Sequence, residues 1–256
     1  MSQFNNLVRF VKRPDGRPTP DVFKVEKERL RQLKAGEYLM RNAYLSMDPA
    51  LVGRMRDEDN YAEKASLGEV MHSYGIGQVI ESNNPNVKVG SVRFGRVDMQ
   101  EYSIFSDELA CKEINLGLAE ASSYLGAMGV NGATAYFALQ EIGQPKAGET
   151  VLVSAGGSAV GSVAAQIAKN LGCKTVGIVS TDAKAKEVMT DFGFDAVVSY
   201  RDKSIDELSK DISKACPQGV DVYFDNTSGD ISEAVLDNLN ENSRIAVVGR
   251  LGISHL

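Results

Sequence analysis

The residues best suited to chemistry form a glycine-rich turn, Gly156-x-Ser158-x-x-Gly161. It differs from the G-x-G-x-x-G spacing of dinucleotide-binding turns only in its middle residue. An apolar run, Thr150–Ser154, precedes the turn, and a helix-periodic stretch follows it as far as Gly172. Glycines here allow the backbone to approach a pyrophosphate, whose charge then meets the free N–H groups of a helix N-terminus. The sequence therefore predicts a dinucleotide site; a tight turn without a ligand is the alternative.

The second apolar run, Thr175–Val179, ends in residues that bear on the choice of dinucleotide. NAD enzymes commonly place an acidic residue at this point to hold the ribose 2′-hydroxyl. Here Ser180 and Thr181 are neutral and Lys184 follows, and a lysine with two hydroxyls can meet a 2′-phosphate. Asp182 is an acidic residue that argues for NAD instead, but we expect its role to be that of N-cap of the next helix. We therefore predict NADP(H) as the cofactor.

Residues that ligate metals are sparse. Zinc alcohol dehydrogenases need Cys, His and carboxylate ligands. This chain has only His72 and His255, and its cysteines, Cys111, Cys173 and Cys216, are far apart in sequence. We expect His72 on the surface or on a pocket wall. Without a metal, hydrogen-bond donors must stabilise a carbonyl or enolate oxygen, so we predict a zinc-independent protein with no metal site.

The two halves of the sequence have different patterns. Residues 1–125 hold short strand-like runs between Gly, Pro and Asn turns, which is typical of a mostly antiparallel β domain. Residues 126–256 alternate apolar runs with helix-periodic stretches, which predicts an α/β domain with a doubly wound parallel Rossmann sheet. We expect a helix at Ile231–Leu239 and a fifth strand at Arg244–Val248. Because a full dinucleotide fold has a sixth strand, we expect the domain to be truncated at its C-terminus. The other four strands are expected at Thr150–Ser154, Thr175–Val179, Ala196–Tyr200 and Val220–Phe224.

The composition excludes several classes of protein. Of 256 residues, 43% are hydrophobic and 24% charged, as in ordinary globular chains. A net charge of −6 without a basic stripe argues against nucleic acid as a partner. No window approaches the roughly 18 apolar residues of a membrane span. Three scattered cysteines fit a reducing compartment, so we predict a cytoplasmic location.

A series of stretches, taken in order, also matches a known family. They are Arg41–Pro49, Gly53–Met55, Leu67–Met71, Gln100–Tyr102, Gly132–Phe137, Ile142–Glu149, Gly193–Asp195 and Asp225-Asn226. The chain resembles the zinc-free branch of the medium-chain dehydrogenase/reductase superfamily: prostaglandin reductases (leukotriene hydroxydehydrogenases), alkenal double-bond reductases and bacterial curcumin reductase. The resemblance implies a GroES-like catalytic and substrate domain before the Rossmann domain, and a homodimer for a full-length relative.

The resemblance further implies an enzyme that uses NADPH to reduce the C=C bond of α,β-unsaturated aldehydes and ketones. Tyr44 and Tyr74 match pocket tyrosines of the family. One of them, or the nicotinamide ribose, would stabilise the enolate oxygen; packing is the alternative role. The glycine spacing already indicates Gly156 and Ser158 at the pyrophosphate, and the end of the second apolar run indicates Ser180 at the 2′-phosphate. The resemblance itself implies Ala159, Val160 and Gly161 at the pyrophosphate, Lys184 and Tyr200 at the 2′-phosphate, and Thr134, Asn226, Val248 and Gly249 near the nicotinamide.

Departures from the family keep other functions open. Ser158 replaces a family glycine, Met99 stands where a tryptophan is usual, and Ala50 stands where a tyrosine is frequent. The segment Arg250–Ser254 lacks a family tyrosine that touches nicotinamide and substrate. About 80 residues of a typical two-domain member are also absent. A quinone reductase and a non-catalytic dinucleotide-binding paralogue are the alternatives.

Overall fold

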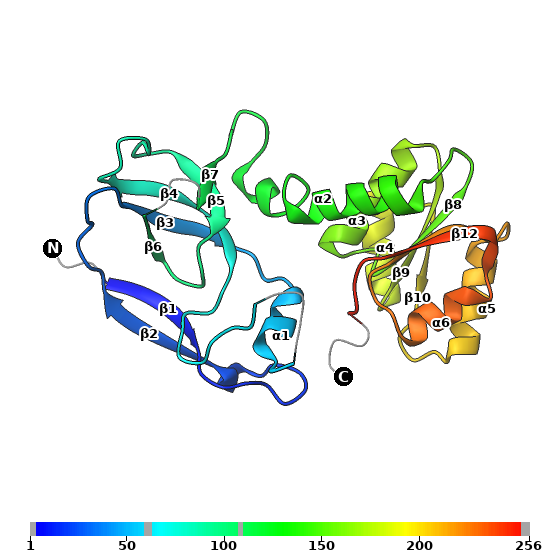
Figure 1. The fold of residues 1–256 in the computed structure, drawn as a ribbon. Coiled ribbons are helices and arrows are strands. Elements are labelled where there is room, and N and C mark those ends of the chain that lie inside the picture. Colours follow the sequence, from blue (N-terminus) through cyan, green and yellow to red (C-terminus); the bar gives the residue numbers. More distant parts are fainter. Residues whose placement is uncertain (1–3, 59–62, 107–109, 252–256) are drawn as a thin grey trace. The chain divides into compact units, whose positions relative to one another are not determined.

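The computed structural model describes residues 4–58, 63–106 and 110–251 (Figure 1). By their internal contacts they form two compact units, Met1–Leu125 and Gly126–Leu256. Each unit has hydrophobic clusters of its own. Among the described residues, no helix is both long and apolar enough to span a bilayer.

The first unit consists mostly of antiparallel strands. Strands β1 and β2 form a two-stranded sheet, and the other five form a sheet in the order β6-β3-β4-β5-β7. Every recorded pairing in these two sheets is antiparallel, as predicted. The elements are β1 (Phe4–Phe10), η1 (Pro20–Val22), β2 (Phe23–Arg29), β3 (Tyr38–Leu45), α1 (Ala50–Met55), β4 (Tyr74–Ser82), β5 (Val92–Arg96), β6 (Tyr102–Phe105), β7 (Cys111–Glu113) and η2 (Ala121–Leu125).

Strand β3 runs from the core of this unit to its surface. Its first residues, Tyr38, Leu39 and Met40, are buried, and the Tyr38 ring stacks on Phe105 at 5.3 Å between centroids. The register with β4 is irregular between Asn42 and Tyr44, and the residues after Asn42 are exposed. The far end of β3 is therefore available to a ligand.

The second unit is a parallel α/β sheet in the order β10-β9-β8-β11-β12, as predicted. From β8, the strands β9 and β10 are added on one side and β11 and β12 on the other, so the strand order reverses between β8 and β11. The elements are α2 (Val130–Phe137), η3 (Ala138–Gly143, a π-helix), β8 (Thr150–Ser154), α3 (Ala159–Asn170), β9 (Lys174–Val179), α4 (Asp182–Phe192), β10 (Ala196–Ser199), α5 (Ile205–Ala215), β11 (Val220–Asp225), α6 (Asp230–Leu236) and β12 (Leu239–Val247).

Two neighbouring boundaries predicted for this unit are wrong. The helix expected at Ile231–Leu239 ends at Leu236, and β12 begins at Leu239, before the expected Arg244. The polar stretch Asn240–Ser243 lacks the apolar run by which the other strands are detected, yet it belongs to the strand. Strand β12 lies at an edge of the described sheet, where the outer side of a strand needs no apolar residues.

Alternating side chains of the central strands bury both faces of the sheet. Val151 and Val153 belong to the cluster that includes residues of α2, α3 and α4, whereas Leu152 belongs to the cluster with α5 and α6. Figure 1 shows α3 and α5 on opposite sides of the sheet. Two covered faces explain why the strands are almost wholly apolar.

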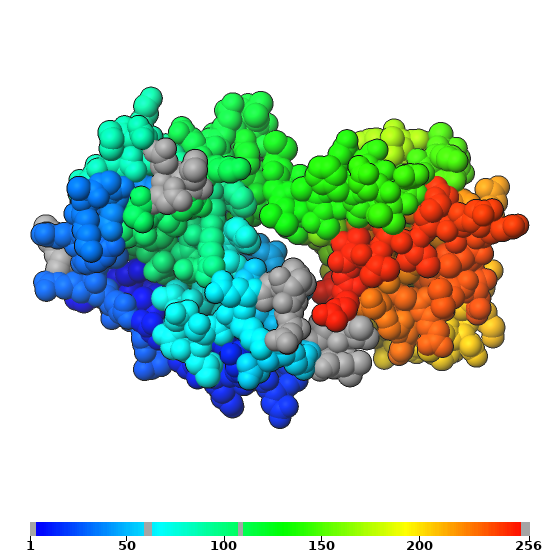
Figure 2. Space-filling model, viewed as in Figure 1, coloured from blue at the N-terminus to red at the C-terminus, as the bar shows by residue number. Residues whose placement is uncertain are grey.

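Helix α2 lies at the surface of its unit (Figure 2). Tyr136 and Phe137 are 49% and 58% exposed, and the two rings meet edge to face at 5.3 Å. On its inner side, Ala135 is buried against α3.

Candidate functional site

The glycine turn joins β8 to α3, and Ser158 is its capping residue. The Ser158 side chain accepts a hydrogen bond from the Gly161 N–H at 3.0 Å. The first N–H groups of a helix have no acceptor within that helix, so the amides of Ala159 and Val160 remain available to an anion. The serine that departs from the glycine spacing therefore has a local structural role, which its frequency at helix N-caps explains.

The glycines of the turn allow close packing of the protein itself. A Cβ atom at Gly161 would lie 2.4 Å from the carbonyl oxygen of Ala155, within the turn. A Cβ at Gly156 would lie 3.0 Å from the Phe194 ring, and one at Gly157 would lie 2.8 Å from Lys184 Cε. These glycines thus bring α3 and the Lys184 side chain close to the turn.

Ala155, the first residue of the turn, has a left-handed backbone with φ of 50°. A residue with a Cβ atom adopts this conformation only at a cost of roughly 1–2 kcal/mol. The next amide, that of Gly156, donates to the Ile178 carbonyl of β9 at 3.0 Å. The turn is thus held in place by the neighbouring strand.

The residues after β9 begin α4, and here one prediction is wrong. Thr181, not Asp182, is the N-cap, because the Thr181 side chain accepts from the Lys184 N–H at 3.2 Å. The carboxylate of Asp182 instead accepts a hydrogen bond from the Ser199 hydroxyl at the end of β10. The Lys184 Nζ lies 3.7 Å from the position of a Cβ built on Gly157, so its ammonium is beside the glycine turn.

Ser180 and Tyr200, the other residues predicted at the 2′-phosphate, follow β9 and β10, and backbone hydrogen bonds fix their positions. Ser180 accepts through its carbonyl from the Arg201 N–H at 3.3 Å. Tyr200 directly follows β10, donates its amide to the Val179 carbonyl, and packs its partly buried side chain against the cluster under α5 and α6. Both therefore lie at the carboxyl edge of the sheet.

A buried carboxylate, Asp225, organises the point where the strand order reverses. Asp225 is 4% exposed and ends β11, next to β8. Its Oδ1 accepts from the backbone amides of Thr227 and Ser228, both at 2.9 Å, and from the Tyr223 hydroxyl at 3.0 Å. Its Oδ2 accepts from the Ser232 hydroxyl at 2.8 Å. The carboxylate thus fixes the turn that follows the strand.

The structure brings Asn226, Val248 and Gly249 together at this point. Asn226 is buried; its backbone N–H donates to the Ser154 hydroxyl at 2.9 Å and its side-chain amide donates to the Ser154 carbonyl at 2.7 Å. Val248 and Gly249 both donate their amides to the Asp225 carbonyl, at 2.8 and 3.0 Å. A Cβ on Gly249 would lie 2.7 Å from the Asn226 oxygen, so only glycine fits there.

Thr134 lies in α2, and its hydroxyl is directed along its own helix. It donates to the Val130 carbonyl at 2.7 Å. Its oxygen can still accept a hydrogen bond from an amide donor. The role predicted for Thr134 at the nicotinamide stays a prediction.

Tyr44 and Tyr74 lie on the five-stranded sheet of the first unit. Tyr44 pairs with Ile76 of β4, and Tyr74 is two residues from Ile76 on that strand, so the two tyrosines share a face. Tyr44 is 48% exposed and Tyr74 is 37% exposed. The Tyr74 ring stacks on Phe94 at 6.0 Å and meets the edge of the His72 ring at 5.4 Å.

His72 is buried, contrary to a surface position. It is 5% exposed, and its buried Nδ1 has no hydrogen-bond partner among the described residues. Asp98 Oδ1 lies 3.8 Å from Nδ1, too far for a hydrogen bond. Burial, with the charges of Arg96 and Arg54, lowers the pKa of His72 from 6.5 to about 4, so the imidazole is neutral at pH 7.

The described residues contain no group of three or more His, Cys, Asp or Glu side chains that could hold a metal ion. The three cysteines are buried and unpaired by disulfides, and burial raises the pKa of the Cys111 and Cys216 thiols to about 11. The Cys111 and Cys216 thiols are therefore protonated near neutral pH. His255, the other histidine of the chain, lies outside the described residues.

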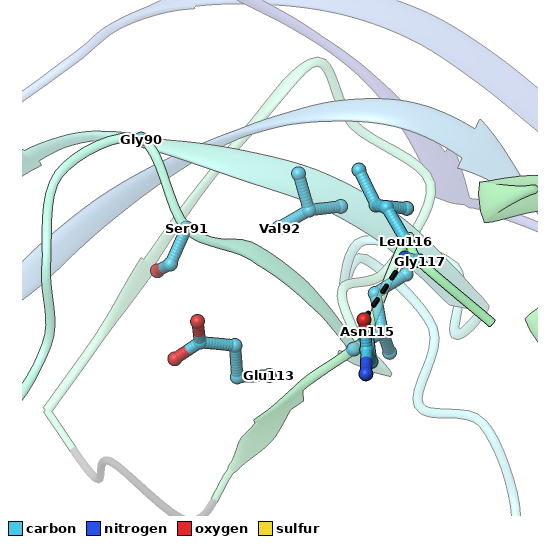
Figure 3. A pocket seen from close by; sticks show the side chains of 8 residues that line it. Gly90, Ser91, Val92, Glu113, Asn115, Leu116 and Gly117 are labelled. Carbon is cyan, nitrogen blue, oxygen red and sulfur yellow. Dashed lines mark hydrogen bonds between the residues drawn. The ribbon is translucent and has the colours of Figure 1, made fainter.

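The first unit also has an open hollow of about 470 Å³ beside β5 and β7. Figure 3 shows its lining residues, among which Asn115 accepts a hydrogen bond from the Gly117 N–H at 2.9 Å. None of the predicted site residues lines it. It carries no argument for a function.

Comparison with known proteins identifies the family. Residues 7–113 match a family described as the N-terminal domain of oxidoreductase, and residues 159–255 match one described as zinc-binding dehydrogenase. The chain is 41% identical over 251 residues to YfmJ of Bacillus subtilis (strain 168), named as an NADP-dependent oxidoreductase, covering 98% of this chain and 73% of that protein. It belongs to the medium-chain dehydrogenase/reductase superfamily, in the branch that includes alkenal and prostaglandin reductases.

This dehydrogenase/reductase chain is also 38% identical to the NADPH-dependent curcumin reductase of Escherichia coli (strain K12), covering 93% of this chain and 68% of that protein. Among solved structures, CurA from Vibrio vulnificus in complex with NADPH superposes with a TM-score of 0.90 at 34% identity. That match covers 98% of this chain and 73% of the other. The predicted fold and family are confirmed, and the chain is related to NADP-dependent oxidoreductases.

Sequence reasoning missed three residues of this edge. Asp225 and Phe194 lie within stretches that match the family, but neither was given a role. Asp225 is the last residue of the apolar strand β11, and an acid in that position is expected to be buried and hydrogen-bonded. Ser199 had no such signal, because its contact with Asp182 joins the end of β10 to the first residue of α4, 17 residues earlier in the chain.

Proposed function

We propose that this chain binds NADPH on its second unit and reduces the C=C bond of α,β-unsaturated aldehydes and ketones, with the first unit holding the substrate. The observation that carries the proposal is the convergence of donors at the glycine turn. The open amides of Ala159 and Val160 begin α3, and the Lys184 ammonium lies beside the same turn. The amides at the helix N-terminus fit the pyrophosphate, and a lysine beside them fits a further phosphate of the same dinucleotide.

The 2′-phosphate would be held by Lys184, Tyr200 and Ser180. Lys184 supplies the positive charge, and the two hydroxyls supply hydrogen bonds at the same edge of the sheet. Charge-assisted hydrogen bonds of this kind contribute roughly 1.5–3 kcal/mol each. The Ser199 hydroxyl donates a hydrogen bond to the Asp182 carboxylate, which orients that carboxylate toward β10.

The nicotinamide end would lie at the reversal of the strand order, where open α/β sheets bind their ligands. Asn226, Val248 and Gly249 surround this point, and Asp225 holds the turn between them. Thr134 would accept a hydrogen bond from the nicotinamide amide. Bound NADPH supplies the hydride that the β-carbon of the substrate receives.

Reduction of an enone or enal places negative charge on its carbonyl oxygen as an enolate. The Tyr44 or Tyr74 hydroxyl would donate a hydrogen bond to that oxygen. The exposure of both tyrosines and their common face on the sheet support this role. The α-carbon then takes a proton from water, which completes the addition of one hydride and one proton across the double bond.

The chemistry needs no zinc, because a hydrogen-bond donor can replace the Lewis acid at the oxygen. We propose that the protein is zinc-independent, although one matching family is described as zinc-binding. Elemental analysis of the purified protein tests this point. Stoichiometric zinc, with loss of activity after chelation, would contradict it.

Steady-state oxidation of NADPH tests the whole proposal. The rate is measured with an α,β-unsaturated aldehyde, with its saturated counterpart and with a quinone. We expect oxidation with the unsaturated aldehyde only, and the saturated aldehyde as the product. Oxidation with the quinone alone would replace this function with a quinone reductase, and no oxidation with any of them would contradict an enzymatic role.

A further inference from the structure

Asp182 lies three residues after β9, the second strand of the parallel sheet, near the point at which NAD-dependent enzymes place an acid to hold the ribose 2′-hydroxyl. A free carboxylate there accepts from that hydroxyl and repels a 2′-phosphate. In this structure, however, Asp182 Oδ1 accepts from the Ser199 hydroxyl. The acid that would favour NADH is thus engaged by another residue of the chain.

The fold brings these two residues together from neighbouring strands. Ser199 pairs in register with Val179 across the parallel β9–β10 ladder, and Asp182 follows β9 by three residues. Ser199 is 9% exposed, whereas Asp182 is exposed. The buried hydroxyl therefore has a fixed position, and the exposed carboxylate turns toward it.

Among the described residues, the Ser199 hydroxyl is the one recorded hydrogen-bond partner of the Asp182 side chain. The cap of α4 is Thr181, whose side chain accepts from the Lys184 amide. As the first residue of the helix, Asp182 gains the favourable effect of the helix dipole in any side-chain orientation. The Ser199 contact is what selects one orientation among those available.

We propose that Ser199 is a specificity-determining residue, which holds the Asp182 carboxylate toward β10 and away from the ribose 2′ position. This inference rests on the proposed function, since it concerns the dinucleotide that the same site accepts. Loss of the Ser199 hydroxyl frees the carboxylate to rotate. It then accepts from the 2′-hydroxyl of NADH, and it opposes the 2′-phosphate that Lys184 attracts.

A double-mutant cycle tests this role. Dissociation constants for NADPH and NADH are measured by titration for the unmodified chain, Ser199→Ala, Asp182→Asn and the double variant. We expect Ser199→Ala to lower the preference for NADPH by about tenfold, the effect of one hydrogen bond to a charged group. Asp182→Asn alone should change the preference less than threefold, and the double variant should regain the preference of the unmodified chain.

Recovery of the NADPH preference in the double variant distinguishes a role of Ser199 in specificity from a role in stability alone. If Ser199 only stabilised the fold, Ser199→Ala would weaken both dinucleotides equally, and Asp182→Asn would not restore the ratio. Ser209→Ala is the matched control, because it removes a hydroxyl of α5 that accepts a hydrogen bond from the Asn238 side chain and makes no recorded contact with Asp182. If Ser199→Ala does not fold, Ser199→Cys, a weaker donor of similar size, takes its place.

The outcomes distinguish this inference from the proposed function. A chain that binds NADPH in preference to NADH, with the same ratio after Ser199→Ala, would overturn the inference and leave the function intact. Absence of binding for both dinucleotides by the unmodified chain would overturn both.

Discussion

The carboxyl edge of the parallel sheet and the tyrosine face of the first unit are built in different ways. At the sheet edge the polar groups are fixed by the protein itself: Asp225 is 4% exposed and accepts from two amides and several hydroxyls. On the tyrosine face, Tyr44 and Tyr74 are 48% and 37% exposed. The comparison indicates that the polar groups at the sheet edge are already fixed by contacts within the protein, whereas the two tyrosine side chains are accessible to solvent.

The largest effect on stability is expected at Asp225, whose carboxylate accepts several hydrogen bonds at the sheet edge. Asp225→Ala leaves several buried donors without an acceptor, each at a cost of roughly 1–3 kcal/mol. We expect the free energy of unfolding to fall by about 4 kcal/mol, measured by urea denaturation. Asp230→Ala, in the exposed first turn of α6, is the control and should change it by less than about 0.5 kcal/mol. Similar values for the two variants would show that the network is not important for stability.

His72, the buried histidine whose ring meets that of Tyr74, predicts a dependence of stability on pH. The pKa of His72 is lowered to about 4 in the folded chain, against 6.5 in the unfolded chain. As the pH falls from 7 to 5, the unfolded chain therefore takes up a proton that the folded chain does not, and stability decreases. The expected loss from this group is about 2 kcal/mol.

The measurement is urea denaturation at pH 7 and pH 5. The variant His72→Gln has no titrating group at this position, so its stability should fall less over that interval than that of the unmodified chain. An equal fall in both proteins would place the pH dependence elsewhere.

The glycine turn offers a test of close packing at the sheet edge. Gly161→Ala places a Cβ atom 2.4 Å from the Ala155 carbonyl oxygen, which forces α3 or the turn to shift. We expect a loss of about 2 kcal/mol in stability and weaker binding of NADPH. Gly117→Ala is the control, because its Cβ would approach only the Asn115 side chain, at 3.1 Å. Unchanged NADPH affinity in Gly161→Ala would remove the turn from the binding site.

The smallest effects are expected on the exposed face. Tyr44→Phe and Tyr74→Phe remove a hydroxyl and keep the ring, so each protein should fold with almost unchanged stability. In the enal reductase assay, the variant that lacks the donor to the enolate should lose roughly tenfold or more in kcat, with a smaller change in KM. If neither variant loses activity, another group stabilises the oxygen, and the tyrosines only pack.

Most of the fold could be predicted from the sequence, because its signals are local. Apolar runs such as Thr150–Ser154 and glycines such as Gly172 mark the ends of strands and helices in the second unit. The end of α6 and the start of β12 were misplaced, since the polar residues of an edge strand resemble a loop. Asp182 was predicted as the N-cap of α4, but Thr181 has that role. Both residue types are frequent N-caps, so the sequence does not decide between neighbours.

The site could be predicted only in part. Hydrogen bonds bring Asn226, Val248 and Gly249 together at the reversal of the strand order, and their predicted place near the nicotinamide stays a prediction. The buried position of His72 and the contact of Ser199 with Asp182 depend on tertiary packing between distant strands, which no spacing in the sequence encodes. The roles of all these residues toward a cofactor and a substrate stay proposals.

Titration of NADPH and NADH against the unmodified chain and Lys184→Ala tests the central claim most directly. The account predicts that the unmodified chain binds NADPH more tightly than NADH. Lys184→Ala should lose about 1.5–3 kcal/mol of NADPH affinity and almost none for NADH, whereas Lys186→Ala, on the same helix, should change neither. An unchanged preference in Lys184→Ala would contradict the proposed 2′-phosphate site.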